Sequence, residues 1–440
     1  MNLRRFILSL IILLAPVLAG ADEMGEIHIS PKPRSIEMQK GRFKAVGKPM
    51  NCDSSFGADC LTAIREFANS LSVAGGKVSS FATSVGLASA VENGKVKGFI
   101  FILDPELDRE EYSIEIGPKS VVVNVSGFSG LSYAIETLKQ MLPDAIYGNS
   151  YSADSDWYMP CAIIKDKPER EERGLMLDCS RHFFSVAEIK RVLDRMAEYK
   201  MNLFRWHLTD DQGWRVEIKK YPELTLIGGY RDGTITDDGT SDGRRYGGYY
   251  TQEQIKDIVG YAAGQGITVI PEITVPGHVQ AALAALPWLG CAEEELYVAE
   301  GWDVSSHGLC PAKNSTYDFL DDLFGELAYL FPAGQIILGG YDCPLSEWAQ
   351  CPDCQDMAKT LGLSDTPDAT AMEGIAVQFR DAVEALLENR GKKAVWLDGN
   401  PEKTGDESLV WTEKIVSDQA LDDYLFPLIP AIGEKQWNGK

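Results

Sequence analysis

Short apolar runs alternate with amphipathic helical segments over the last two thirds of the chain, and this alternation constrains the fold most. Helix-capping patterns begin at Ser185 and Thr251, and apolar residues at helical spacing follow each of them. Strands that alternate with helices form a parallel sheet, and polar residues cluster after each strand. This pattern favours a TIM-type (β/α) barrel over an open doubly wound sheet. The strand-like runs are 175–178, 202–208, 267–273, 335–340 and 393–397.

The preceding part of the chain predicts a separate, smaller α/β domain. Its strand-like runs are rich in β-branched and aromatic residues, and one segment, 131–142, has helical spacing. The charged segment 164–169 contains Pro168 and marks the boundary. We therefore expect a small domain over 22–168 and the barrel over 169–440. The strand-like runs are 99–103, 112–116 and 121–125.

The first 21 residues have the pattern of a signal peptide. Arg4 and Arg5 precede an apolar stretch, 6–14, and Ala19-Gly20-Ala21 has the small residues of a cleavage site. A single membrane anchor is the alternative, but the apolar stretch is short for a span. We expect export to the periplasm or the extracellular space, with no membrane span after removal of the signal. The net charge of −23 argues against nucleic acid or an anionic membrane as a partner.

Nine cysteines make disulfides plausible in an exported chain. Cys351-Pro-Asp-Cys354 follows Cys343 closely and has the spacing of a zinc-ligand pair. Such a site usually needs a second pair, so the sequence favours a local disulfide or unpaired thiols, and we expect no metal and no cofactor. Candidate bridges are Cys52–Cys60 and Cys291–Cys310.

Aromatic and charged residues gather at the predicted carboxyl ends of the strands. Tryptophan rings stack on the apolar face of a sugar, and charged groups form hydrogen bonds to its hydroxyls. The combination therefore points to a neutral sugar as the ligand. The clusters lie at 178–182, 206–215, 271–278, 396–398 and 411–413.

The same clusters resemble glycoside hydrolase family 20, the β-N-acetylhexosaminidases. The resemblance is carried by long motifs in the family's order and covers the mature chain, including a small N-terminal domain. The motifs are Arg173-Gly-Leu-Met-Leu-Asp-Cys-Ser-Arg-His-Phe-Phe184, Trp206-His-Leu-Thr-Asp-Asp-Gln-Gly-Trp214, Pro276-Gly-His278, Leu309-Cys-Pro311 and Trp411-Thr-Glu413.

The resemblance implies substrate-assisted chemistry, in which the sugar's own 2-acetamido oxygen attacks the anomeric carbon. An adjacent Asp-Glu pair serves this reaction: the Glu protonates the leaving oxygen and the Asp orients the acetamido N–H. It also implies that Asp210 and His278 form a hydrogen-bonded pair that tunes the acid. Expected substrate contacts are Arg181 and Glu413 to hydroxyls, with Trp396 and Trp411 as walls of the acetamido pocket. Asp211 is expected to brace a loop, and His182 and His207 to belong to the scaffold.

The catalytic pair departs from the family pattern. Gly340-Tyr341-Asp342-Cys343 follows the run 335–339, and Tyr341 and Asp342 stand where the family has Asp and Glu. A neutral phenol lacks the charge of a carboxylate, and such a loss typically costs roughly 10²–10³ in rate. Asp342 is one methylene shorter than Glu, and a displacement of about 1 Å costs about 10²-fold.

A second departure is the short connection between Trp396 and Trp411. The family places two further strand–helix units there, and even one crossover needs about a dozen residues. We therefore predict a barrel that lacks about two βα units and is shortened between 397 and 410. The barrel is incomplete, closed in an unusual way, or internally deleted.

Two hypotheses for the function follow. The first is an exo-acting β-N-acetylhexosaminidase that cleaves terminal GlcNAc or GalNAc from glycans by retaining, substrate-assisted catalysis, with reduced activity. The second is a non-catalytic descendant that binds sugars or a partner protein.

Overall fold

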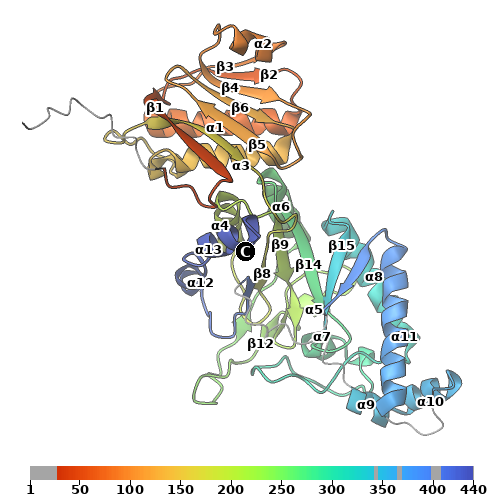
Figure 1. Cartoon of the computed structure of the whole chain (residues 1–440). Helices are drawn as coiled ribbons and strands as arrows, with labels where there is room; N and C mark the ends of the chain where they lie inside the picture. Colours follow the sequence, from red (N-terminus) through yellow and green to blue (C-terminus); the bar gives the residue numbers. More distant parts are fainter. Residues whose placement is uncertain (1–26, 341–344, 364–368, 398–407, 440) are drawn as a thin grey trace, which may run out of the picture.

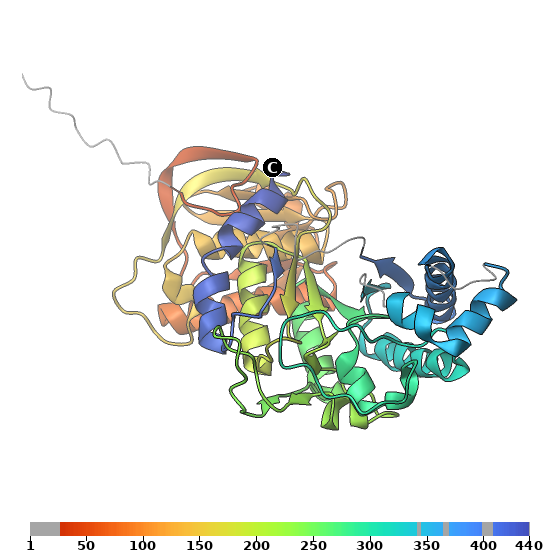
Figure 2. The same cartoon turned by 90° about the horizontal axis from the view of Figure 1, so that it is seen from below.

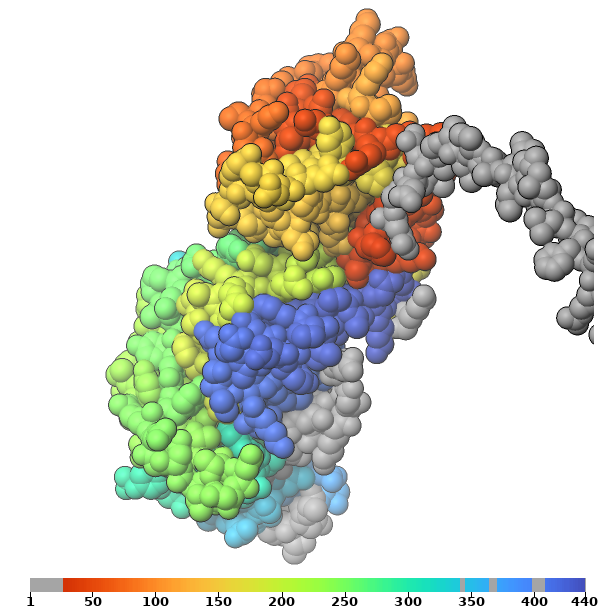
Figure 3. All heavy atoms as spheres, turned by 90° about the vertical axis from the view of Figure 1, so that its left-hand side faces the viewer, coloured from red at the N-terminus to blue at the C-terminus, as the bar shows by residue number. Residues whose placement is uncertain are grey.

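The computed structural model describes residues 27–340, 345–363, 369–397 and 408–439. The predicted signal peptide, Tyr341 and Asp342 lie outside these residues. Figure 1 shows a small domain stacked on one end of a larger one, and Figure 3 shows the C-terminal helices running along the side of the larger domain toward the smaller. In the part of the chain that is described, no helix has the length and apolar character to cross a membrane.

The small domain is built on a seven-stranded mixed sheet in the order β1-β7-β5-β6-β4-β2-β3. The β-branched runs predicted from the sequence form β4, β5 and β6, each within one residue of its predicted bounds. The strands are β1 (Ser35–Lys44), β2 (Met50–Asp53), β3 (Phe81–Ser84), β4 (Gly98–Leu103), β5 (Tyr112–Ile116), β6 (Ser120–Val125) and β7 (Tyr158–Asp166).

Helices α1 and α3 pack on this sheet and close its hydrophobic core. The predicted helix at 131–142 corresponds to α3. The helices are α1 (Ala58–Gly75), α2 (Leu87–Glu92), α3 (Phe128–Gln140) and the short 3-10 helix η1 (Asp144–Tyr147). The boundary that we propose near Pro168 lies between the end of β7 and the start of the first strand of the large domain.

Six parallel strands form the sheet of the large domain among the described residues, in the order β16-β15-β14-β9-β8-β17. This order and the helices between the strands fit a TIM-type barrel, as predicted. The strands are β8 (Gly174–Asp178), β9 (Leu203–His207), β14 (Thr268–Thr274), β15 (Gln335–Gly339), β16 (Lys393–Trp396) and β17 (Leu409–Val410). Two short hairpins, β10 (Thr209–Asp210) with β11 (Gly213–Trp214) and β12 (Tyr230–Arg231) with β13 (Tyr246–Gly247), add to the loops.

The helices cover the outer face of this sheet, and Figure 2 shows them around the strands. Ser185 caps α4 through its side chain, and Thr251 and Gln254 form the predicted capping box of α6. The helices are α4 (Val186–Glu198), α5 (Glu223–Leu226), α6 (Gln252–Gly264), α7 (Gln280–Ala285), η2 (Pro287–Leu289), α8 (Asn314–Leu330), α9 (Leu345–Gln350), α10 (Pro352–Thr360), α11 (Ala369–Glu388), α12 (Asp418–Leu425) and α13 (Ile429–Trp437).

Side-chain alternation assigns each strand residue to one face of the sheet. Phe204, Ile336 and Leu338 pack in the large core beneath the helices. Ile270 and Ile337 belong to a second, smaller cluster on the inner face. The two faces therefore differ: the outer one is apolar, and the inner one leads to the polar residues at the strand ends.

The sheet is interrupted between β16 and β17, where the sequence has only a short connection. Strand β17 pairs with β8 through Leu409 and Met176, so the last strand closes against the first as in a complete barrel. Strand β16 pairs with β15, and no pairing joins β16 to β17 among the described residues. A complete barrel has eight strands. The six strands of the described residues fit the predicted loss of about two βα units between β16 and β17, which stays a prediction because residues 398–407 lie outside the described residues.

Candidate functional site

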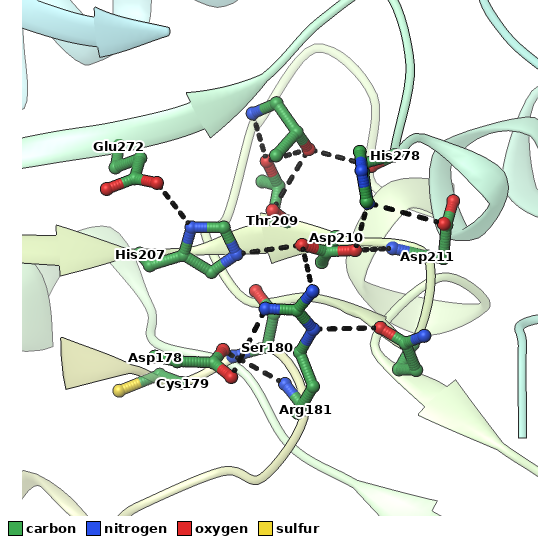
Figure 4. A network of polar contacts seen from close by, with 12 residues as sticks. Asp178, Cys179, Ser180, Arg181, His207, Thr209, Asp210, Asp211, Glu272 and His278 are labelled. Carbon is green, nitrogen blue, oxygen red and sulfur yellow. Dashed lines mark hydrogen bonds and ion pairs between the residues drawn. The ribbon is translucent and has the colours of Figure 1, made fainter. Parts of the chain in front are cut away.

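The site is centred on Asp210, which lies directly after the second barrel strand. Its carboxylate contacts three cationic side chains: Arg181 Nη2 at 3.2 Å, His207 Nε2 at 3.0 Å and His278 Nδ1 at 3.1 Å (Figure 4). The expected hydrogen bond between Asp210 and His278 is thus present. All four residues are buried. Three strand ends, from β8, β9 and β14, are joined at one carboxylate.

Glu272 and His207 extend this network into the inner face of the sheet. His207 Nδ1 lies 2.8 Å from Glu272 Oε1, and Arg205 forms an ion pair with the other oxygen of Glu272. Glu272 and His207 are partners in the register of β14 and β9, so their side chains meet at one level of the barrel. His207 therefore links two buried acids, which is compatible with the scaffold role expected for it. Sequence reasoning also missed the role of Glu272.

Mutual contact fixes the charges of these groups. Burial alone would lower the pKa of His207 and of His278, but Glu272 raises the first to about 10 and Asp210 raises the second to about 9. Burial would raise the pKa of Asp210, yet Arg181 and His278 hold it well below its usual range. The pKa of Glu272 is lowered to about 2 by His207 and Arg205, against the effect of burial. Negatively charged carboxylates and positively charged histidines therefore alternate along the network.

Asp211 has the bracing role expected from the sequence. Its two oxygens accept hydrogen bonds from the backbone N–H groups of Gln280, at 2.9 Å, and Ser305, at 3.1 Å. Burial, and then the charge of Asp210, raise its pKa to about 6. Asp211 thus ties the loop after β9 to the start of α7 and to a more distant loop.

The loop after β17 supplies the opposite wall. The Arg181 guanidinium lies over the ring of Trp411, 4.9 Å from its centre, and the His207 ring meets the same indole edge-on at 5.3 Å. Thr412 binds Asp178 Oδ2 through both its backbone N–H and its hydroxyl. Glu413 follows, half-buried. Trp411 therefore lies beside Arg181.

Trp396 does not lie in this site, which corrects the expectation. Its indole N–H donates to Glu384 Oε1 at 2.8 Å, and Arg380 lies over its ring at 4.8 Å; both residues belong to α11. Trp396 pairs in register with Leu338, an outer-face residue, so alternation directs its side chain toward the helices. The motif therefore placed Trp396 correctly at the end of a strand, but its side chain lies on the outer face of the sheet and not in the site.

The chain passes from the wall of the site into the segment that contains Tyr341. Gly339 and Gly340 line the same small cavity as Arg181, His278 and Trp411. Gly340 has a φ of +79°, and a Cβ there would lie 2.7 Å from the carbonyl oxygen of Val275. Only glycine fits so close to that loop.

Two groups of potential metal ligands occur among the described residues. The first is Asp210, Asp211 and His278. Arg181 and two histidines already neutralise Asp210, so this group is satisfied by protein cations. The second is a cluster of four cysteines. The eight described cysteines are free thiols, so neither candidate bridge, Cys52–Cys60 or Cys291–Cys310, is formed.

A parallel barrel with a buried acid–base network at the carboxyl ends of its strands is the architecture of the (β/α)-barrel glycoside hydrolases. The model of the catalytic domain of glycosyl hydrolase family 20 matches residues 171–404, and the model of domain 2 of that family matches residues 26–167. The chain belongs to glycoside hydrolase family 20.

Relatives and solved structures agree with this assignment. The chain is 39% identical over 292 residues to a β-hexosaminidase of Porphyromonas gingivalis, covering 66% of this chain and 36% of that protein. It is 33% identical over 380 residues to a β-hexosaminidase of Vibrio furnissii, covering 85% and 57%. The chain thus spans about half or less of the length of these relatives.

Among solved structures, the family 20 exo-β-N-acetylglucosaminidase of Vibrio harveyi in complex with N-acetylglucosamine superposes with a TM-score of 0.74 at 27% identity, covering 94% of this chain and 74% of that one. A β-N-acetylhexosaminidase of Bacteroides fragilis gives 0.74 at 25% identity, covering 94% and 91%.

Proposed function

We propose that this chain is an exo-acting β-N-acetylhexosaminidase that removes terminal GlcNAc or GalNAc from glycans outside the cytoplasm, with a reduced rate. The observation that carries the proposal is the contact of Arg181, Asp210 and His278 beside Trp411 at the strand ends of a family 20 barrel. We assign the sugar-facing roles to Arg181, Trp411 and Glu413.

The catalytic step depends on the residues that follow Gly340. We propose that Asp342 protonates the leaving oxygen while the acetamido oxygen of the substrate attacks the anomeric carbon. His278, held protonated by Asp210, is the positive group to which we assign the tuning of this acid. Tyr341 occupies the position of the acetamido-orienting Asp and is neutral, so developing positive charge on the acetamido group lacks a carboxylate partner.

Release of 4-nitrophenol from its β-GlcNAc glycoside tests this function. The wild-type chain should turn over faster than an Asp342→Ala control. The double substitution Tyr341→Asp with Asp342→Glu should raise the rate by roughly 10⁴–10⁵ if the two penalties are independent. Equal rates for wild type and the Asp342→Ala control would reject an enzymatic role for this chain.

A second candidate function is sugar binding without catalysis. Tyr341 and the missing barrel units favour this function, because the acetamido group loses its carboxylate partner while Arg181 and Trp411 keep the sugar-facing groups. A thiazoline analogue of the oxazoline intermediate separates the two functions, because an active site binds it tightly and a merely lectin-like site does not.

A further inference from the structure

Four cysteines that are distant in the sequence meet beside α9 and α10. Cys291 follows η2, Cys310 precedes α8, and Cys351 and Cys354 begin α10. The Sγ atoms of all four lie within 4.8 Å of one another. Cys354 Sγ is 3.7 Å from that of Cys310 and 4.0 Å from that of Cys291.

These separations match a tetrahedral thiolate site. Four sulfurs at about 2.3 Å from a zinc ion lie about 3.8 Å from each other. A disulfide needs about 2.05 Å, and all four cysteines are free thiols. We propose that Cys291, Cys310, Cys351 and Cys354 form a structural zinc site. The sequence alone favours a local disulfide or unpaired thiols, because its one visible pair, Cys351 and Cys354, lacks the second pair that the fold supplies.

The surroundings fit a closed structural site. Cys310, Cys351 and Cys354 are buried, and Cys291 is half-buried. They lie in a small hydrophobic cluster of their own with Trp348, Met372 and Ile375, apart from the main core of the barrel. A closed site with four protein ligands holds zinc for stability, whereas catalytic zinc keeps an open position.

Backbone groups around the sulfurs strengthen this interpretation. Cys351 is the N-cap of α10 and Pro352 is its first residue, so Cys354 lies in the first turn on the same side. The N–H of Cys310 donates to Leu289 O at 2.8 Å, which brings the segment of Cys291 alongside.

A metal here would anchor α9 and α10 to the loop at 307–309. Helix α9 begins at Leu345 and already contacts the loop at 307–309: Glu347 binds His307 and the N–H of Gly308, and the Trp348 indole donates to Leu309 O at 3.1 Å. The N–H of Leu309 in turn donates to Pro276 O, in the loop that positions His278. Figure 1 shows α9 and α10 at the end of the barrel away from the small domain. The zinc site thus joins two loops that border the candidate site.

Metal content of the full chain, purified without a metal-affinity step, tests the proposal. We expect about one zinc per chain by plasma mass spectrometry, released by a mercurial reagent. Cys354→Ser and Cys291→Ser should each lower zinc content about tenfold or more, and the half-buried position of Cys291 makes loss of the fold a poor explanation for that variant. Cys161→Ser, at a buried free thiol in β7, is the matched control and should keep its zinc.

Two further readouts separate a metal site from a merely packed cluster. Cobalt(II) exchanged into the wild-type chain should give the intense visible bands of tetrahedral thiolate coordination. Hydrogen exchange in α9 and α10 should rise on zinc removal, while exchange in β4 to β6 stays unchanged. Iron in place of zinc, disulfides that link these four cysteines, or full zinc retention in Cys354→Ser would overturn the proposal.

Discussion

At the residue level, the site is a line of buried groups whose charges alternate. Glu272, His207, Asp210 and His278 follow one another at hydrogen-bond distance, with Arg181 beside Asp210. An unpaired buried charge is costly, and each of these has a partner of opposite sign. The network therefore holds Asp210 as a permanent anion, which orients its neighbours and does not itself transfer a proton.

This network predicts how stability depends on pH. His207 and His278 have pKa values of about 10 and 9, against 6.5 unfolded. Because both are raised, their stabilisation is fully present below pH 6.5 and is lost as pH rises through 9 to 10. We expect the free energy of unfolding, measured in urea, to fall by on the order of 5 kcal/mol between pH 6.5 and 9.

Substitution of the two histidines measures how much each contributes to the pH dependence of the free energy of unfolding. His278 has a φ of +55°, so His278→Asn is the suitable change because Asn tolerates that backbone conformation. His278→Asn and His207→Gln should each be less stable at pH 6.5 and show a flatter fall toward pH 9. A slope equal to that of the wild type in both variants would contradict the assigned charges.

At the level of elements, the alternation of side chains between the two faces of a strand decides which of them reach the site. His207, Glu272 and Trp411 reach it, whereas Trp396, at the end of β16, contacts α11. Trp396→Ala should lower the free energy of unfolding by about 2–3 kcal/mol through lost packing and leave the affinity for N-acetylglucosamine unchanged. Trp411→Ala should weaken that affinity about tenfold.

Calorimetric titration with N-acetylglucosamine and urea unfolding on the same two variants measure both effects. Trp411→Ala serves as the matched comparison because it removes the same side chain after β17, at the opposite edge of the sheet. A loss of affinity in Trp396→Ala as large as that in Trp411→Ala would contradict this prediction and show that Trp396 contributes to sugar binding.

The sequence predicts elements better than it predicts contacts between them. Local patterns located the strands and the capping residues of α4 and α6, and the motif order brought Asp210 to His278. The face of Trp396 was missed because a motif gives a strand end without its register. The Glu272–His207 pair and the four-cysteine cluster were missed because their members come from different segments, and only the folded sheet brings them together.

At the scale of the whole molecule, the last helix fastens the two domains to each other. Trp437, in α13, is fully buried in the core of the small domain, and its indole donates to Asp166 Oδ1 at 3.0 Å. Lys200 reaches the same carboxylate at 3.2 Å, and Arg173 pairs with Glu110 at 2.7 Å. Residues from the first part of the large domain and from its last helix thus contact the small domain near the end of β7.

This arrangement predicts that Trp437 couples the unfolding of the domains. Trp437→Ala leaves a large cavity and removes a donor from buried Asp166, which together should cost about 3–5 kcal/mol. Because the loss falls at the boundary, differential scanning calorimetry should show one transition in the wild type and two in the variant. Trp302→Ala is the matched control: Trp302 is half-buried against Arg231 and His182 at the other end of the barrel, so its loss should leave a single transition. One unsplit transition in Trp437→Ala would mean that the contacts of Arg173 and Lys200 suffice to join the domains.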